Sequence, residues 1–437
     1  MKLRLATAGL AIMMLSATAA CGGGGSSASS DAKTLTYWAS NQSPSLAEDK
    51  TNLAPVLKKF EAQTGVKVDL QVIGWPDLYS KILAATTSGK GPDVLNIGNT
   101  WAPSLQATGA FLPFGSSEFT AIGGKDKFVD AALKTGGAEG KDPTSVPYLG
   151  LVYGLYYNKR MFADAGLKPP TTWQELVDAA KKLTDPAKGV YGMAMEGGSY
   201  TESVHFAFIF GMQNGGEPFD GAGKPDFTNP GMVAGVKQYV DLMGEHKVVN
   251  PSAAQYKNGP EAPGDFAKGK AAMLMSQNNA DNTLQADGMK SSEYGVVAIP
   301  MPDPMPSGGQ TVASFVAGIN LSIFKNTKNK SAALKFVKFM TSQQTQQTLD
   351  KPFTALPVIK NGTVNFTDSA TEAKAFQTIL NTQAVPLPLL PAEAAYETNV
   401  GNAVNTLIAQ AATGKSVSDA DIKAALQEAQ DKMASAG

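Results

Sequence analysis

Residues 34–98 alternate between two hydrophobic patterns, and this alternation restricts the possible folds more than any other feature of the chain. Residues 34–40 (TLTYWAS) are rich in β-branched and aromatic side chains and predict a strand. The next apolar side chains recur with the spacing of one helix face: Leu53, Val56, Leu57 and Phe60. Gly65 then stands where a glycine commonly ends a helix. The segment therefore begins as a strand followed by a helix.

Two more strands and a second helix follow. Residues 66–72 alternate apolar and polar side chains, which is typical of a strand. Residues 78–87 predict a helix, and the apolar residues 94–98 predict a third strand. The order strand, helix, strand, helix, strand favours parallel strands with crossover helices.

The rest of the chain keeps a mixed pattern. Thr172 and Glu175 have the spacing of a capping box at the start of an amphipathic helix. Residues 271–275 and 317–324 predict buried strands, and the chain beyond about residue 366 is mostly helical. We therefore predict an α/β fold.

Length and composition limit the classes of function. A chain of 437 residues is too long for one ordinary core and predicts two lobes. Its 37 basic and 38 acidic residues nearly cancel, which argues against nucleic acid as a partner. Only two histidines (His205 and His246) and one cysteine occur, and no nucleophile elbow, phosphate loop or zinc motif is found. We expect no catalytic residues, no metal and no cofactor.

The single cysteine, Cys21, lies between an apolar run and a Gly/Ser tract. Residues 1–20 combine a short basic head with an apolar stretch of signal-peptide length, so we expect export from the cytoplasm. Residues 18–21 (TAAC) resemble a bacterial lipobox, although Thr18 stands where Leu is usual. This resemblance implies a lipidated Cys21 that anchors the protein to the outer face of the cell membrane; the alternative is an ordinary secretory signal. Residues 21–30 then predict a flexible linker.

Several segments, in order, resemble the extracellular sugar-binding proteins of ATP-driven (ABC) importers, the group that includes maltose-binding protein. The similar segments are FEAQTGVKVDLQ, SGKGPDVLNIGNTWAPSLQATGAFLPF, VPYLGLVYGLYYNKRMFADAGLKPPTTWQEL, DFAKGKAAMLMSQNNADNTL, FVAGINLSIFKNTKNKSAALKFVKFM and TLIAQAATGKSVSDADIKAALQEAQ. They cover nearly the whole chain after the linker.

The resemblance implies a periplasmic-binding-protein-like fold with two lobes. Each lobe is a mixed sheet flanked by helices, several chain crossings form the hinge, and helices end the chain. Lobe 1 would comprise residues 31–149 and 317–365, and lobe 2 would comprise residues 150–316 and 366–437. The implied protein is a monomer that binds a sugar between the lobes and delivers it to the membrane subunits of a permease.

A sugar needs a flat aromatic surface beneath its ring and planar polar groups around its rim, because buried hydroxyls must find partners. Candidate residues therefore lie just after strands, where open sheets bind ligands. In the first lobe these are Asn41, Gln42, Trp75, Asn99 and Trp101. Both tryptophans have an alternative role, which is packing on the lobe surface.

Further candidates come from the crossing segments and the second lobe. Tyr153 and Phe315 lie in the two crossings, and Phe315 has hinge packing as its alternative. The segment between a strand and the next helix offers Gln277, Asn278, Asn279 and Asp281, with helix capping as the alternative. In the late helix Tyr396 and Glu397 match the place of a stacking aromatic in relatives, or form a solvated face. Glu202 and His205 lie one helical turn apart; we expect a surface pair, with a ligand-binding pair as the alternative.

We interpret the chain as a receptor that captures a disaccharide or short oligosaccharide. One alternative is a secreted carbohydrate-active enzyme, which would need two carboxylates flanking the bond that it cleaves. Another is a receptor for a peptide, a polyamine or chelated iron. The balanced charge and the amide-rich segments after strands favour a neutral polyol.

Overall fold

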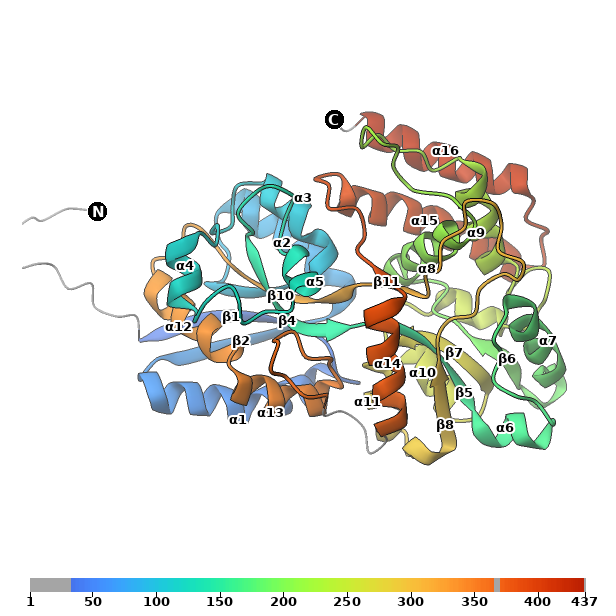
Figure 1. Ribbon diagram of the computed structural model, residues 1–437, viewed down its shortest axis with the longest axis horizontal. Coiled ribbons are helices and arrows are strands. Elements are labelled where there is room, and N and C mark those ends of the chain that lie inside the picture. The colour runs from blue at the N-terminus through green and yellow to red at the C-terminus, as the bar shows by residue number, and fades with distance from the viewer. Residues whose placement is uncertain (1–32, 365–369, 436–437) are drawn as a thin grey trace, which may run out of the picture. The chain divides into compact units, whose positions relative to one another are not determined.

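The computed structural model describes residues 33–364 and 370–435. The described residues form one compact unit. The predicted signal segment, the linker and Cys21 lie outside the described residues. The predicted α/β class is confirmed, since a five-stranded sheet and a four-stranded sheet are each flanked by helices (Figure 1).

The first sheet has five strands in the order β2-β1-β3-β10-β4. Its strands are β1 (Thr34–Ser40), β2 (Lys67–Ile73), β3 (Val94–Gly98), β4 (Ser145–Leu151) and β10 (Ala317–Ile323). Strand β1 pairs with β2 and β3 in parallel, as the alternating pattern predicts, whereas β10 runs antiparallel to both of its neighbours. The sheet is therefore mixed.

Helices flank this first sheet. They are α1 (Leu46–Thr64), α2 (Trp75–Ser88), η1 (Asn99–Trp101), α3 (Ala102–Ala107), α4 (Ser116–Ala121), α5 (Asp130–Lys134), α12 (Lys330–Met340) and α13 (Gln343–Phe353). Helix α1 ends at Gly65, whose φ of 71° requires the left-handed conformation that glycine adopts most easily. Helix α2 begins three residues earlier than predicted, because Pro76 is tolerated in the first helical turn. Trp75 is thus a helical residue.

The second sheet has four strands in the order β6-β7-β5-β8. Its strands are β5 (Tyr153–Asn158), β6 (Tyr191–Ala194), β7 (Ala271–Gln277) and β8 (Tyr294–Val297). Around it lie α6 (Lys159–Asp164), α7 (Trp173–Leu183), η2 (Pro186–Lys188), α8 (Tyr200–Gln213), α9 (Pro230–Val240), η3 (Pro251–Gln255), α10 (Glu261–Ala267), α11 (Ala280–Ala286) and η4 (Ser291–Glu293). The predicted capping box of Thr172 and Glu175 is present at the start of α7.

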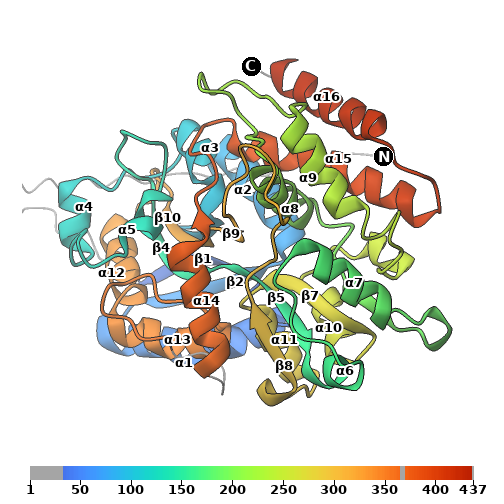
Figure 2. The same cartoon turned by 45° about the vertical axis from the view of Figure 1, so that its right-hand side comes forward.

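The chain has two crossings: one runs directly from the first sheet to the second, and the other runs from a third, two-stranded sheet to the first. Only Val152 separates β4 from β5, and only Val316 separates β9 (Ser314–Phe315) from β10. Strand β9 pairs in parallel with β11 (Ala384–Val385), which follows α14 (Ala370–Thr382). Helix α14 packs on β5 and β8 (Figure 2).

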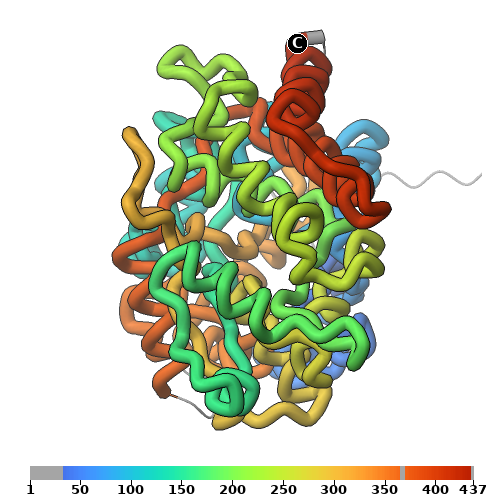
Figure 3. Tube along the Cα trace, turned by 90° about the vertical axis from the view of Figure 1, so that its right-hand side faces the viewer, coloured from blue at the N-terminus to red at the C-terminus, as the bar shows by residue number. Residues whose placement is uncertain are grey.

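The last two helices return to the helices of the second sheet. Helix α15 (Glu393–Ala412) packs against α8, and α16 (Asp419–Ser435) packs against α15 and α9 (Figure 3). Helix α15 also contacts η1 and α3 beside the first sheet. It therefore joins elements of both sheets, and its side chains lie next to the space between them.

Candidate functional site

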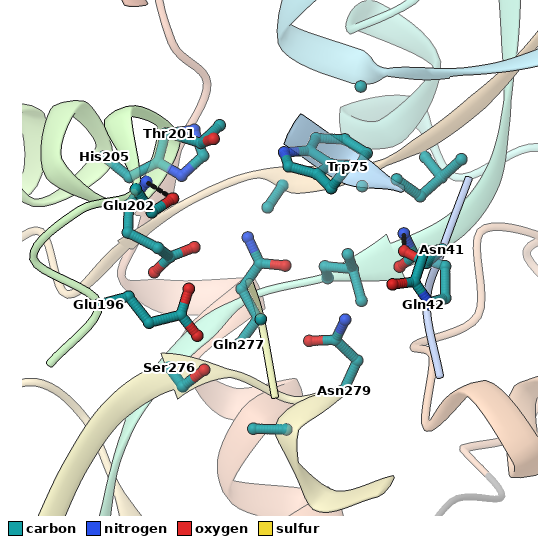
Figure 4. A pocket seen from close by; sticks show the side chains of 18 of the residues that line it. Asn41, Gln42, Trp75, Glu196, Thr201, Glu202, His205, Ser276, Gln277 and Asn279 are labelled. Carbon is teal, nitrogen blue, oxygen red and sulfur yellow. Dashed lines mark hydrogen bonds between the residues drawn. The ribbon is translucent and has the colours of Figure 1, made fainter. Parts of the chain in front are cut away.

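A pocket with an empty volume of about 940 Å³ lies between the two sheets. One wall comes from the segments that follow β1, β2 and β3, and the other comes from the segment before α8 and from the end of β7. The crossing residues Leu151 and Phe315 line it as well. Seven of the predicted residues line this pocket: Asn41, Gln42, Trp75, Asn99, Gln277, Asn279 and Phe315. The polar side chains and Trp75 face one another across it (Figure 4).

A buried carboxylate shapes the segment after β1. Asp49 Oδ1 accepts hydrogen bonds from the backbone N–H groups of Gln42 and Ser43, at 3.1 and 3.0 Å. Asn41 Nδ2 donates to the other Asp49 oxygen and to the Ser43 carbonyl. Burial raises the pKa of Asp49, and these donors oppose that rise. Gln42 is held at the wall by this loop, and its Oε1 has no hydrogen-bond partner among the described residues.

Trp75 offers an aromatic face to the pocket because Trp101 supports it from behind. The two indoles stack with ring centroids 4.7 Å apart and an interplanar angle of 27°. Trp75 is half-buried, whereas Trp101 is only 1% exposed and donates its Nε1–H to Glu397 Oε2 at 2.7 Å. Trp101 therefore lies behind the wall of the pocket, and only Trp75 is accessible for stacking.

Asn99 lines the pocket and is only 4% exposed. Its Nδ2 donates to the carbonyl oxygen of Val316 at 2.8 Å, which ties the segment after β3 to the second crossing. The side-chain carbonyl of Asn99 remains available as an acceptor. Asn99 can thus serve the hinge and a ligand at once.

Tyr153 is fully buried, and its hydroxyl connects three residues of the pocket wall. The hydroxyl lies 2.7 Å from Glu202 Oε1 and 2.8 Å from His205 Nδ1, and it accepts from Gln277 Nε2 at 3.0 Å. It has no capacity left for a ligand, so Tyr153 orients pocket residues instead of lining the pocket. The expected surface pair of Glu202 and His205 is wrong, because both residues line the pocket and both contact Tyr153.

His205 continues this network to helix α15. Its Nε2 lies 3.3 Å from Glu397 Oε1, so the Glu397 carboxylate joins His205 to Trp101. Burial alone would raise the pKa of Glu397, but the hydrogen bond and charge of His205 lower it below its usual value. Burial and the neighbouring Glu397 raise the pKa of Glu393. The Glu393 carboxyl therefore keeps its proton more readily than an exposed carboxyl does.

The polar segment after β7 divides between pocket and interior. Gln277 and Asn279 line the pocket, and Asn279 stands at the N-cap of α11 without a side-chain capping bond. Asn278 is fully buried and accepts from the Val152 N–H at 2.7 Å while donating to the Thr354 carbonyl. Asp281 is 1% exposed and accepts from Gln285 within α11. Asn278 and Asp281 are therefore structural residues outside the pocket.

Two further predictions concern aromatic residues. Phe315 lines the pocket and also packs in the hinge, with its ring 4.4 Å from the His205 ring and 5.7 Å from the Tyr153 ring. Tyr396 is fully buried between Phe219 and Phe227, so neither ligand stacking nor a solvated helix face describes it. The late helix presents its Tyr396 and Glu397 side to the protein interior.

Several lining residues have no counterpart among the sequence predictions. They come mostly from the segment before and at the start of α8 and from the segment before α10: Ser43, Thr100, Glu196, Ser199, Thr201, Lys257, Gly259, Pro260, Ser276 and Thr283. Helix α8 is buried on nearly every face, so its hydrophobic pattern shows no preferred side. The only local signal is Ser199, whose side chain caps α8 by accepting from the Glu202 N–H.

Nowhere in residues 33–364 and 370–435 do three or more His, Cys, Asp or Glu side chains gather in a way that suits a metal ion. Within the same ranges, every helix is too short or too polar to span a lipid bilayer.

The fold and the pocket between its sheets are those of a solute receptor, and comparisons with known proteins agree. The profile of the bacterial extracellular solute-binding protein family matches residues 43–347. The chain therefore belongs to this family of binding proteins, whose members work outside the cytoplasm.

Individual relatives match most of the chain. The diacetylchitobiose binding protein DasA of Streptomyces coelicolor is 27% identical over 395 residues, which is 89% of this chain and 87% of the relative. A solute-binding protein of an ABC transporter from Thermotoga lettingae, solved with α-D-tagatose, is 26% identical with a TM-score of 0.77. That match covers 92% of this chain and 100% of the other. A chitin oligosaccharide binding protein has a TM-score of 0.76 at 24% identity over 93% of this chain and all of its own, which shows a shared fold.

Proposed function

We propose that this protein captures a disaccharide or short oligosaccharide in the pocket and delivers it to the permease of an ABC importer. The observation that supports this most directly is the presence of the Trp75 indole and the amides of Asn41, Gln42, Gln277 and Asn279 in one cavity. An indole covers the C–H face of a sugar, and amides both donate to and accept from its hydroxyls. Two of the relatives are named for chitin-type oligosaccharides, and a third was solved with tagatose.

The ligand would act by bridging two lobes. We assign residues 31–149 and 317–365 to lobe 1, and residues 150–316 and 366–437 to lobe 2. The lining residues of the pocket come from both groups, so a bound sugar would contact both lobes at once. A ligand that makes more contacts when the lobes are close favours the closed form, and a permease can recognise that form.

Titration calorimetry with a panel of neutral and modified sugars tests this proposal. We expect a saturable interaction with at least one sugar, and we expect the sugar to be recovered unchanged. Trp75→Ala should weaken that interaction, whereas Trp38→Ala, which removes an indole outside the pocket, should leave it intact. Failure of the whole panel to bind, with a folded protein, would contradict sugar capture.

An enzymatic role has one feature in its favour, which is the pair of carboxylates Glu196 and Glu202 in the pocket. Glycoside hydrolases place two carboxylates on either side of the scissile bond. Here both residues belong to one short segment and lie on one wall, which favours binding over hydrolysis (Figure 4). Incubation of the purified protein with oligosaccharides, followed by an assay for new reducing ends, separates the two functions.

We also propose that residues 1–20 are removed and that Cys21 is lipidated, which would anchor a monomeric receptor at the membrane. Two acyl chains hold a protein at a bilayer, whereas one chain gives marginal binding. Mass spectrometry of the N-terminal peptide tests this directly. Cys21→Ser should move the protein from the membrane fraction to the soluble fraction.

A further inference from the structure

One end of the pocket is acidic, and His205, which contacts the same Tyr153 hydroxyl as Glu202, is the basic residue beside it. Glu196, in the segment after β6, and Glu202, in the first turn of α8, both line the main pocket. Both also line a second, much smaller cavity. The two carboxylates thus lie where the cavities meet, facing Ser276 and Gln277 (Figure 4). We call Glu196 and Glu202 the acidic end.

No Lys or Arg among the described residues forms an ion pair with the acidic end. Glu202 Oε1 accepts from the Tyr153 hydroxyl, and the structure gives no hydrogen bond to the Glu196 carboxylate from any described residue. Lys257 lines the same pocket but is exposed at its rim. Burial, followed by the charges of Glu202 and Glu261, raises the pKa of Glu196. Burial also raises the pKa of Glu202, and the charge of His205 and the Tyr153 hydrogen bond oppose that rise. In the free protein this end therefore favours a bound proton, and a cationic group of a ligand can take the place of that proton.

The smaller cavity supplies an aromatic surface beside the carboxylates. Its walls include the rings of Phe206 and Tyr239, together with apolar side chains of β6 and β7. Tyr239 is 1% exposed, and the described residues provide no hydrogen bond to its hydroxyl. Tyr239, Glu196 and Glu202 all line this smaller cavity, and burial followed by the charges of the two carboxylates raises the pKa of Tyr239. A hydroxyl without a protein partner in the same cavity as two carboxylates lacks one hydrogen-bonding group that a ligand can supply.

An ammonium group satisfies all of these requirements. It carries one positive charge and three N–H donors, which match two carboxylates and a phenolic oxygen. Aromatic ring faces attract cations, and the attraction strengthens where water is excluded. A neutral hydroxyl supplies no positive charge, so it would do nothing to stabilise the ionised form of the two carboxylates.

We propose that the pocket selects a sugar bearing a primary ammonium group, and that Glu196 and Glu202 bind this group. The inference rests on the proposed sugar capture and specifies its ligand class. Tyr239 completes the ammonium site from the smaller cavity, while Trp75 and the amides bind the rest of the sugar. A neutral or N-acetylated sugar would lack the charge that the acidic end balances.

Three β-1,4-linked disaccharides test this inference because they differ only in the substituent at carbon 2. Glucosaminyl-glucosamine carries amines, N,N′-diacetylchitobiose carries acetamides and cellobiose carries hydroxyls. Calorimetric titration of the full chain in slightly acidic buffer should show the amine form binding roughly tenfold more tightly than either other form, or better, a factor that corresponds to about 1.4 kcal/mol. Equal or weaker binding of the amine form would overturn the inference, whatever the variants show.

Two variants locate the effect. Glu196→Gln and Glu202→Gln keep the shape of the side chains and remove one charge each, so each should reduce the preference for the amine by about tenfold. Glu428→Gln removes a charge from an exposed position on α16 and should leave the preference unchanged. Retention of the full preference in both pocket variants would also overturn the assignment.

The inference and the proposed function fail in different ways. If neutral disaccharides bind as tightly as the amine, sugar capture stands and the ammonium site falls. If none of the three disaccharides binds, the ammonium site falls again, and the wider sugar panel decides whether sugar capture survives.

Discussion

The Trp101 indole donates a hydrogen bond of 2.7 Å to Glu397, although 296 residues separate them in the chain. Trp101 lies in η1 beside the first sheet, and Glu397 lies in α15 beside the helices of the second. His205 contacts the other oxygen of the same carboxylate. Trp101 packs behind Trp75 on one wall of the pocket, and His205 lies on the other wall. The Glu397 carboxylate contacts both residues and so connects the two walls.

Trp101→Phe should lower the free energy of unfolding by about 1.5 to 3 kcal/mol, the usual value of a hydrogen bond to a charged group. The phenyl ring keeps most of the packing but leaves Glu397 Oε2 without its donor. Urea denaturation measures the change. Trp173→Phe is a matched control, because Trp173 is half-buried and the described residues accept no hydrogen bond from its indole. Similar losses in both variants would show that packing, not the hydrogen bond, is responsible.

Trp75→Ala should weaken binding of any captured sugar by about tenfold or more, since buried aromatic residues commonly dominate binding energy. Trp75→Phe should retain part of the affinity because a smaller ring still covers a sugar face. Trp38→Ala is the matched control: Trp38 is also half-buried, but it lies on β1 under the Lys81 ammonium, outside the pocket. Calorimetry on the three variants gives the comparison, and equal losses for Trp75 and Trp38 would remove Trp75 from the site.

Asp350 should make stability depend on pH. It is fully buried in α13, its carboxylate oxygens have no hydrogen-bond partner among the described residues, and burial raises its pKa to about 8. Because this folded-state pKa exceeds the ordinary value of 3.8, the folded protein binds more protons than the unfolded chain between these two pH values. The contribution of Asp350 to the free energy of unfolding is therefore largest below pH 3.8 and declines up to about pH 8, by at most about 1.4 kcal/mol per pH unit.

Asp350→Asn removes this titration, so the variant should be more stable than the wild type at pH 8 and should show a flatter pH profile. Urea denaturation across this pH range measures both effects. Asp431→Asn, at an exposed position on α16, should leave the profile unchanged. Parallel profiles for the wild type and Asp350→Asn would mean that Asp350 does not carry the buried proton.

Gly401→Ala should destabilise the protein by about 1 to 3 kcal/mol and weaken sugar binding. A Cβ at residue 401 of α15 would overlap the backbone of Tyr200, the first residue of α8. The two helices would have to separate, and α8 carries Glu202 and His205 into the pocket. Gly221→Ala, where a Cβ has open space, should change stability by no more than about 0.5 kcal/mol. Thermal unfolding and calorimetry measure the two effects, and a tolerated Gly401→Ala would contradict the close packing.

Much of the fold could be predicted from the chain because the relevant signals are local. The stripe from Leu53 to Phe60, the helix end at Gly65 and the capping box at Thr172 each act within a few residues, and the structure contains all three. The parallel pairing of β1, β2 and β3 followed from the order of elements. The start of α2 differed by three residues, because the first turn of a helix tolerates Pro76.

The candidate site could be predicted only in part. The rule that ligand residues follow strands located Asn41, Gln42 and Asn99, which line the pocket. The same rule also selected Trp101 and Asn278, whose side chains are buried behind its wall. It passed over Glu196 altogether, since no local pattern marks that residue. Adjacent residues such as Gln277 and Asn278 have the same local sequence context. They differ only in whether the side chain points into the pocket or into the interior.

The sequence by itself determined the elements, their order and the kinds of side chain available at their ends, because helix and strand periodicity and capping depend on near neighbours. Tertiary structure alone decided which of those side chains are accessible to a ligand and which are fully hydrogen-bonded within the protein. Trp101 and Tyr153 hydrogen-bond to residues between 49 and 296 positions away, and such long-range contacts leave no trace in local spacing. The same folding brought Glu196 and Glu202 together with Tyr239 at one end of the pocket.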